Sequence, residues 1–261
     1  MTLAAVTALY RYPVKGLSPE ALPAMVLLRG EGLTHDRKHA LALGTTEFDP
    51  AAPAPLAKTN FLMLARNEAL AQLATKVDTA TGVLTVAYRD GTVAVMADLA
   101  TMEGRTAVED FFTAFAGEAA RGRIRVVSAA RHRFTDIGAP APAMMDCISL
   151  INLSSLRVLE EAMGRTLDPL RFRANVYVDG LPAWSEFDLI ERSLAIGPIP
   201  FRAVRRTRRC PATNVNPATA ERDADVPRAL REHFGHTDLG VYLEVRGNGT
   251  INAGDAIRVP A

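Results

Sequence analysis

The residues best suited to chemistry gather between positions 201 and 215, where several arginines precede a cysteine. The segment reads FRAVRRTRRCPATNV, and its cysteine is Cys210. Positive charge favours a thiolate over a thiol, and the thiolate is the form that attacks electrophiles or binds a soft metal. Guanidinium groups grip phosphate through paired hydrogen bonds. The segment therefore predicts either a soft ligand beside an anion site, or a solvated basic strand that ends in a core cysteine.

A second polar group has the spacing of one face of a strand. Arg171, Arg173 and Asn175 lie two residues apart in the segment PLRFRANVYVDG. In an extended strand such residues point to the same side. We therefore predict a strand over residues 172–178 that directs these three side chains at a shared ligand.

The remaining cysteine and the paired histidines have simpler interpretations. Cys147 stands in the apolar run CISLI and is expected to be a small buried side chain. Two histidine pairs have spacings that could suit a metal on a helix. However, one pair falls in a predicted strand and the other spans a glycine, which disfavours a zinc site. The pairs are His35 with His39, and His233 with His236.

The overall composition narrows the class of protein. The chain has 261 residues, 48% of them hydrophobic, with a net charge of +1 and two cysteines. A general nucleic-acid binder would carry a dominant basic charge. Two cysteines are too few for a disulfide scaffold and suit a reducing compartment. The N-terminus shows neither a signal peptide nor a membrane-spanning run, so we expect a cytoplasmic protein that binds neither nucleic acid nor membrane.

Short strands outnumber helices along the chain, which favours barrel-like β domains. Helices are predicted at 66–74, at 106–116, from a Ser154 cap to Gly164, and from an Asp225 cap to Phe234. Strands are predicted at 3–12, 25–28, 36–43, 83–86, 93–96, 147–151, 193–196, 199–204, 241–245 and 256–259. A change of composition at 129–143 predicts a domain boundary, giving domains at 1–130 and 131–261.

Three separated stretches together resemble the MOSC family, the domain found at the C-terminus of molybdenum cofactor sulfurases and in amidoxime-reducing proteins. YPVKG at 12–16 with GLTHDRKHAL at 32–41 resembles the N-terminal β-barrel of its two-domain members. PLRFRANVYVDG at 169–180 resembles the arginine–asparagine strand, and RRCPATNV at 208–215 resembles the cysteine motif. The resemblance covers nearly the whole chain. It implies a mainly β fold with helices, in which a smaller β-barrel domain precedes the MOSC domain.

The resemblance also implies a site for the molybdenum cofactor. Cys210 matches the protein ligand to molybdenum, and Lys15 and Arg37 match the positions that bind the terminal phosphate of the pterin. Gly16 stands where the family often has serine, so Ser18 is a candidate replacement donor. The other positions that the resemblance assigns to the cofactor or to the wall of its pocket are Asp136, Asn152, Arg171, Arg173, Asn175, Arg209 and Thr213.

The activity implied by the resemblance is a molybdenum-dependent oxidoreductase that reduces small N-hydroxylated substrates. No ferredoxin-type cysteine set follows Cys210, so the electrons would come from a separate donor protein. No aminotransferase-like domain is present, so pyridoxal phosphate is not expected in this chain. The alternative is a sulfur or cofactor carrier, in which Cys210 holds a persulfide or serves as a ligand and the arginines form a docking surface for anionic groups.

Overall fold

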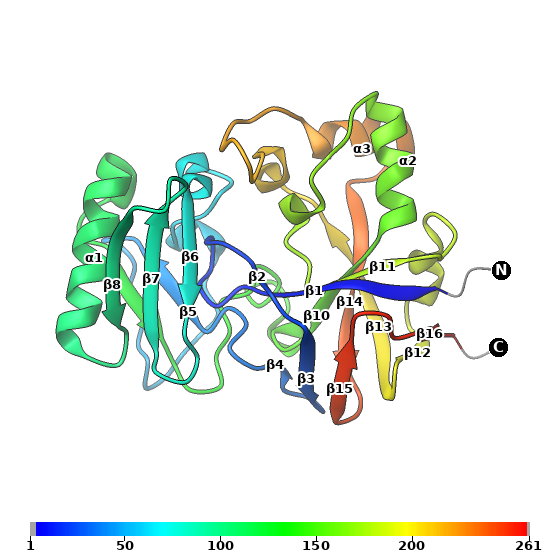
Figure 1. The fold of residues 1–261 in the computed structure, drawn as a ribbon, viewed down its shortest axis with the longest axis horizontal. Coiled ribbons are helices and arrows are strands. Elements are labelled where there is room, and N and C mark those ends of the chain that lie inside the picture. Colours follow the sequence, from blue (N-terminus) through cyan, green and yellow to red (C-terminus); the bar gives the residue numbers. More distant parts are fainter. Residues whose placement is uncertain (1–3, 260–261) are drawn as a thin grey trace.

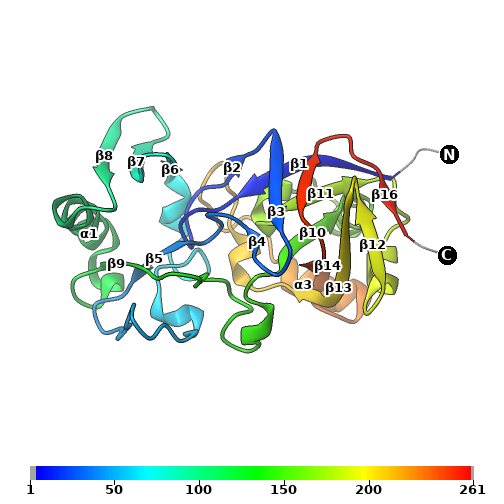
Figure 2. The same ribbon diagram turned by 90° about the horizontal axis from the view of Figure 1, so that it is seen from below.

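The computed structural model describes residues 4–259 and contains, within this range, mostly β-strands with three α-helices (Figure 1). The largest sheet of the described residues has eight strands and curls around its apolar face (Figure 2). In spatial order the strands are β16 (Ile257–Arg258), β12 (Ser193–Ile196), β13 (Ile199–Arg208), β14 (Asp238–Val245), β10 (Ile148–Asn152), β11 (Val176–Asp179), β1 (Ala5–Arg11) and β2 (Glu20–Ala21).

The eight-stranded sheet is covered on both faces, which explains why its central strand β10 is buried throughout. All five residues of β10 are buried. Ile148 and Leu150 face one core, and Ile151 faces a second core beneath α2 (Leu153–Met163) and α3 (Val226–Phe234). Alternate residues of a strand point to opposite faces, so a short apolar run can serve both cores.

Strands from the first part of the chain pair with strands from its last part. β1 pairs antiparallel with β11, placing Leu9 opposite Val176. A three-stranded sheet, in the order β15 (Gly249–Asn252), β3 (Ala24–Leu28) and β4 (Gly32–Leu33), contributes Met25, Leu27 and Ile251 to the first core. The early strands therefore bury apolar surface against the late ones, and they carry the loops that hold Lys15 and Arg37.

A smaller body lies beside the large sheet and contains its own core (Figure 1). Val108 and Phe112 of its helix are fully buried against Leu84 and Val86. The Thr101 side chain caps this helix by accepting a hydrogen bond from Gly104 N at 3.0 Å. The elements of this body are β5 (His39–Ala42), β6 (Leu73–Val77), β7 (Val83–Tyr88), β8 (Val93–Asp98), α1 (Met102–Ala116) and β9 (Arg125–Ser128).

Short 3-10 helices occupy several of the connections, and most of them adjoin the polar residues discussed below. They are η1 (Lys58–Asn60), η2 (Glu68–Gln72), η3 (Gly117–Ala120), η4 (Pro142–Met144), η5 (Pro169–Phe172), η6 (Ser185–Leu189) and η7 (Pro211–Asn214).

The mainly β fold with helices is confirmed, as are the helices that end at Ala116, just before Gly164 and at Phe234. The strands predicted at 83–86, 93–96, 193–196 and 199–204 are also present, and they pair as two hairpins. The helix predicted over 66–74 is wrong, because Leu73–Val77 pairs with β7 and the preceding residues form only η2. The Ser154 cap is also wrong. Asn152 caps α2 and accepts a hydrogen bond from Ser154 N.

The predicted strand over 172–178 is wrong in its first half. Pro169–Phe172 is a 3-10 helix, and Arg173 follows it in the left-handed region at φ 54°. Only Val176–Asp179 is a strand. Pro169 favours a turn at this position, and the Asp168 carboxylate caps that turn by accepting from Leu170 N at 2.8 Å. The division of the chain at residue 130 stays a prediction.

Across residues 4–259, the helices are all too short or too polar to cross a lipid bilayer.

Candidate functional site

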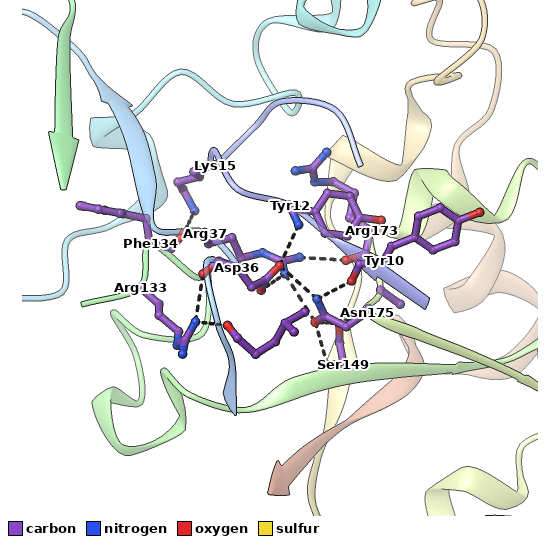
Figure 3. A network of polar contacts seen from close by, with 12 residues as sticks. Tyr10, Tyr12, Lys15, Asp36, Arg37, Arg133, Phe134, Ser149, Arg173 and Asn175 are labelled. Carbon is purple, nitrogen blue, oxygen red and sulfur yellow. Dashed lines mark hydrogen bonds and ion pairs between the residues drawn. The ribbon is translucent and has the colours of Figure 1, made fainter. Parts of the chain in front are cut away.

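Two arginines from distant parts of the chain lie over one tyrosine ring (Figure 3). The guanidinium carbons of Arg37 and Arg173 are 4.7 and 4.4 Å from the ring centre of Tyr12, which is fully buried. Both arginines have positive φ values, 49° and 54°. Such backbone costs about 1 kcal/mol or more for a non-glycine residue, so local structure must compensate for it. Holding these two cations at Tyr12 therefore lowers the stability of the fold unless other interactions offset the cost.

The Asp36 carboxylate organises this cluster. It is buried and accepts hydrogen bonds from Tyr12 N at 2.8 Å, Arg37 Nη1 at 2.5 Å and Asn175 Nδ2 at 3.1 Å. Arg37 Nη2 also donates to the Arg173 carbonyl at 2.9 Å. A carboxylate with three donors is well satisfied in a buried site. Asp36 thus joins the loop after β4 to the start of β11.

Asn175 extends this network into the large sheet. Its Nδ2 also donates to the Tyr10 carbonyl at 3.2 Å, and its Oδ1 accepts from both N and Oγ of Ser149. Its side chain therefore ties together β1, β10 and Asp36 (Figure 3). The structure brings Arg37, Arg173 and Asn175 together, and their part in binding a cofactor stays a prediction.

Lys15 meets Asp136 at the edge of the same cluster. The Lys15 ammonium is buried and donates to Asp136 Oδ1 and to the Phe134 carbonyl at 3.0 Å. Burial lowers the pKa of Lys15, and Asp136 opposes that shift. Burial would raise the pKa of the Asp136 carboxyl, but Lys15 and then Lys58 outweigh it and bring that pKa to about 2. Asp136 is therefore a carboxylate shared by two lysines.

Lys58 links this carboxylate to the cysteine. Its ammonium lies 3.6 Å from Asp136 Oδ2. Burial lowers the pKa of Lys58, but Asp136 and the Cys210 thiol together raise it above its usual value. Lys58 was missed in the sequence, because it stands alone in η1 after a proline- and alanine-rich loop. No spacing pattern connects it to the cysteine 152 residues later, and only the folded chain does so.

Cys210 is half-buried where β13 ends and η7 begins. Its carbonyl accepts from Thr213 N at 3.0 Å and from Thr213 Oγ1 at 2.9 Å. The Thr213 hydroxyl is therefore committed to holding the turn at the cysteine. Across the described residues 4–259, no group of three or more histidine, cysteine, aspartate or glutamate side chains could hold a metal ion.

The arginines before Cys210 do not act as one group. Arg205, Arg206 and Arg208 are exposed, and bulges interrupt the β13–β14 pairing among them. Arg206 lies over the Phe187 ring, and Arg202 pairs with Glu191. The solvated-strand interpretation therefore fits these four residues.

Arg209, by contrast, is buried beside the cysteine and serves the backbone. Its Nε donates to the Leu239 carbonyl at 2.8 Å, and its Nη1 donates to the Phe172 carbonyl at 2.9 Å. Burial lowers the pKa of this guanidinium, but an arginine stays charged at neutral pH. Arg209 thus places a positive charge at Cys210 while it fixes the end of β13.

Arg171 points away from Arg173, contrary to the shared face predicted for them. Its guanidinium is buried and donates from Nη1 and Nη2 to Asp223 Oδ1, both at 3.0 Å, and to the Thr213 carbonyl at 3.1 Å. It therefore supports the turn that carries Cys210 from behind. The divergence follows from the η5 turn, because consecutive residues of a 3-10 helix project in different directions.

Asn152 lies in a separate buried network at the start of α2. Its Nδ2 donates to the Pro182 carbonyl at 2.9 Å and to Glu186 Oε2 at 3.0 Å, while its Oδ1 caps the helix. Ser155 Oγ also donates to Glu186 Oε2 at 2.8 Å. The structure does not bring Asn152 to the arginine cluster.

Gly16 has a conformational reason for its identity. Its φ is +83°, and a Cβ there would lie 2.7 Å from the Leu62 carbonyl oxygen. A serine at this position would be strained in its backbone and would clash. The Ser18 hydroxyl is already engaged, because it donates to the Leu73 carbonyl at 2.9 Å and accepts from Thr75 N at 3.0 Å.

The part of the chain that carries most of these residues is similar to known proteins. Residues 132–258 match the model of the MOSC domain. Molybdenum cofactor sulfurase of Drosophila yakuba is 35% identical over 97 residues, which is 36% of this chain and 12% of that protein. The Anopheles gambiae protein of the same name is 34% identical over 111 residues, covering 38% and 14%. The chain thus spans only about an eighth of the length of these relatives.

Among solved structures, the YuaD protein from Bacillus subtilis aligns over 98% of this chain and 94% of its own, with 14% identity and a TM-score of 0.43. YiiM from Geobacillus stearothermophilus aligns over 44% of this chain and 54% of its own, with 19% identity and a TM-score of 0.35. The domain match contains Asp136, Asn152, Arg171, Arg173, Asn175 and the whole cysteine turn. Residues 132–258 are therefore similar to the MOSC domain, in agreement with the family that the sequence motifs resemble.

Proposed function

We propose that the chain binds the molybdenum cofactor and acts as an oxidoreductase on small N-hydroxylated substrates, with electrons from a separate protein. One observation carries the proposal. Lys58 lies 3.6 Å from Asp136, which it shares with the buried Lys15, and the half-buried Cys210 helps to raise the pKa of Lys58. A single soft ligand therefore stands at the edge of a cationic site.

The charges around this point fit an anionic, sulfur-rich cofactor. Besides the two lysines, Arg37 and Arg173 contribute positive charge, and the carboxylates of the cluster are Asp36 and Asp136. Cations therefore outnumber carboxylates, which favours a phosphate group. A pterin dithiolene would bring its own sulfur ligands, so one protein thiol is sufficient for molybdenum. The residues present fit the group.

Each side chain has a distinct part in this proposal. Cys210 would bind the metal, and Lys15, Lys58 and Arg173 would hold the phosphate. Arg37 has donors committed to Asp36 and to the Arg173 carbonyl, so its main part is to position Arg173. Asn175, Arg209, Arg171 and Thr213 would fix the backbone around the cofactor. When bound, the cofactor would supply an acceptor for the substrate oxygen and two electrons for its removal.

The test is metal and pterin analysis of protein produced in cells that make the cofactor, followed by reduction of benzamidoxime with an artificial electron donor. We expect stoichiometric molybdenum and amidine formation in the wild type, and loss of both in Cys210→Ala. Cys147→Ala is the matched control and should keep both. A Cys210→Ala protein that retains molybdenum and full activity would disprove the assignment of the ligand.

A sulfur or cofactor carrier is the second candidate, and the partial exposure of Cys210 next to Lys58 favours it. Relatives of the chain are named molybdenum cofactor sulfurase, a name that fits handling of sulfur. In this role Cys210 would carry an added sulfur to a client protein. Intact-mass measurement would then show a gain of one sulfur atom on Cys210, and the protein would not reduce benzamidoxime with dithionite and a dye.

A further inference from the structure

A cavity of about 490 Å³ opens between the smaller body and the loop that follows Cys210. Its floor contains Leu43 and Phe61, both buried. Its rim comes from the segment between η1 and η2, from the end of η3 and from Arg222. In Figure 1 the loop after β13 reaches from the large sheet towards this segment. A cavity of this size, partly apolar and partly polar, is typical of small-molecule sites.

Three arginines line this cavity, and they are not equivalent. Arg222 is engaged: it pairs with Glu68 at 2.9 Å and donates to the Ala65 carbonyl at 2.9 Å. Arg66 and Arg121 are exposed, and within residues 4–259 the side chain of neither forms an ion pair. Glu68 is the carboxylate of the lining, and Arg222 neutralises it. Two guanidinium groups therefore remain available on the rim.

The walls of the cavity adjoin the turn that carries Cys210 and the segment that carries Lys58. Arg222 Nη1 donates to the carbonyl of Pro211, the residue after Cys210. Thr59 of the lining follows Lys58, whose ammonium lies 3.6 Å from Asp136 Oδ2. On its other side Phe61 contacts the Lys15 ammonium, which lies 5.8 Å from the ring centre. A molecule in the cavity would therefore be next to the cationic site without displacing it.

We propose that this cavity binds a small organic carboxylate, with its carboxylate on Arg66 and Arg121 and its apolar body over Leu43 and Phe61. Guanidinium groups match the planar geometry of a carboxylate, and the apolar floor requires an apolar body beside it. Resting on the function proposed above, the inference also identifies the substrate class. The preferred N-hydroxylated compounds carry a carboxylate on an aromatic or aliphatic body.

Binding to the cavity can be measured without molybdenum. Isothermal titration calorimetry of the full chain would compare 3-phenylpropionate with its neutral amide, 3-phenylpropionamide, and with phenyl phosphate. The variant is Arg66→Gln with Arg121→Gln, and the control is Arg205→Gln with Arg208→Gln, two exposed arginines outside the lining. We expect the carboxylate to bind the wild type and the control, and to bind the cavity variant about tenfold more weakly or worse.

Three results would overturn the inference: equal binding of acid and amide, unchanged binding to the cavity variant, or tighter binding of phenyl phosphate than of the carboxylate. Thermal unfolding of both double variants checks that each remains folded.

The second measurement is the steady-state kinetics of protein that contains the molybdenum cofactor. The cavity variant should raise KM for 4-carboxybenzamidoxime about tenfold while leaving kcat and the kinetics of benzamidoxime unchanged. Equal effects on both compounds would overturn the substrate assignment. If neither compound is reduced by the wild type, the proposed function fails by itself, and calorimetry alone decides whether the cavity binds carboxylates.

Discussion

Arg37 donates a hydrogen bond from Nη2 to the backbone carbonyl of Arg173 at 2.9 Å. The two residues are separated by 136 positions in the sequence, and both hold a guanidinium over Tyr12. One arginine thus fixes the backbone of the other, so the cation pair is a product of the fold as a whole. Its integrity depends on Asp36, which gives the first prediction.

Replacing Asp36 by alanine should destabilise the protein strongly. The change leaves Tyr12 N without this acceptor and removes one acceptor each from the Asn175 amide and the Arg37 guanidinium, whose charge also loses its carboxylate partner. We expect a loss of about 3 kcal/mol in the free energy of unfolding, measured with urea. Asp188→Ala is the control, an exposed aspartate that should change stability by less than about 0.5 kcal/mol. Similar values for the two variants would contradict the network.

The turn that carries Cys210 should depend on the buried Arg171–Asp223 pair. Asp223→Ala leaves a guanidinium with 1% side-chain exposure uncompensated, and we expect this to cost about 3 kcal/mol. The comparison is Asp179→Ala, which breaks the exposed pair with Arg157 and should cost less than about 1 kcal/mol. Urea unfolding of both variants tests this, and the prediction fails if the exposed pair proves the costlier one to lose.

His39 should make stability fall in mildly acidic solution. Burial, followed by Lys38 and His35, lowers its pKa from 6.5 to about 4. The folded state keeps the imidazole neutral, while the unfolded chain takes up a proton below pH 6.5. The contribution is therefore complete above pH 6.5 and is lost as the pH falls to about 4, by up to about 3 kcal/mol in total.

The control for this pH dependence is His39→Gln, in which the other histidines are unchanged. Urea unfolding between pH 7.5 and 4 should show the wild type losing stability faster than the variant. Parallel curves for the two proteins would show that His39 is protonated equally well in both states.

The two cysteines should differ sharply in reactivity. Burial, reinforced by Glu244 and Asp146, raises the pKa of the Cys147 thiol to about 12. Because the thiolate is the reactive form, alkylation of Cys147 by iodoacetamide at pH 7.5 should be more than about a hundredfold slower than that of Cys210. Peptide mass spectrometry over time measures both rates, with Cys210→Ala and Cys147→Ala as controls. Equal rates would contradict the difference in environment.

Local signals in the sequence were sufficient for the elements that depend on neighbouring residues. The strands predicted at 83–86 and 93–96 flank an Asp-Gly turn, and the helix predicted from Asp225 to Phe234 ends before a glycine, so turn and capping chemistry account for both. The helix predicted at 66–74 failed because pairing with β7 overrode the helix-forming residues of Leu73–Val77. Intrinsic propensity is a weak preference compared with a place in a sheet.

In the candidate site, too, local sequence signals could not predict what depends on the tertiary fold. Family motifs pointed to Lys15, Arg37, Arg173 and Asn175, and these residues do lie together. The same reasoning could not find Lys58, because its importance arises only from its distance to Asp136. Alternation along a supposed strand misled the placement of Arg171, since the backbone turns at Arg173.

The pairing of β3 with β15 also bears on the order in which the protein can fold. Ala24–Leu28 is synthesised well before its partner Gly249–Asn252, with most of the described chain between them. Until that partner is made, β3 can pair only with the short strand β4, and Met25 and Leu27, which end fully buried, lack the cover of β15. Completion of this sheet must therefore wait until the intervening chain has been made, as expected for contacts of high sequence separation.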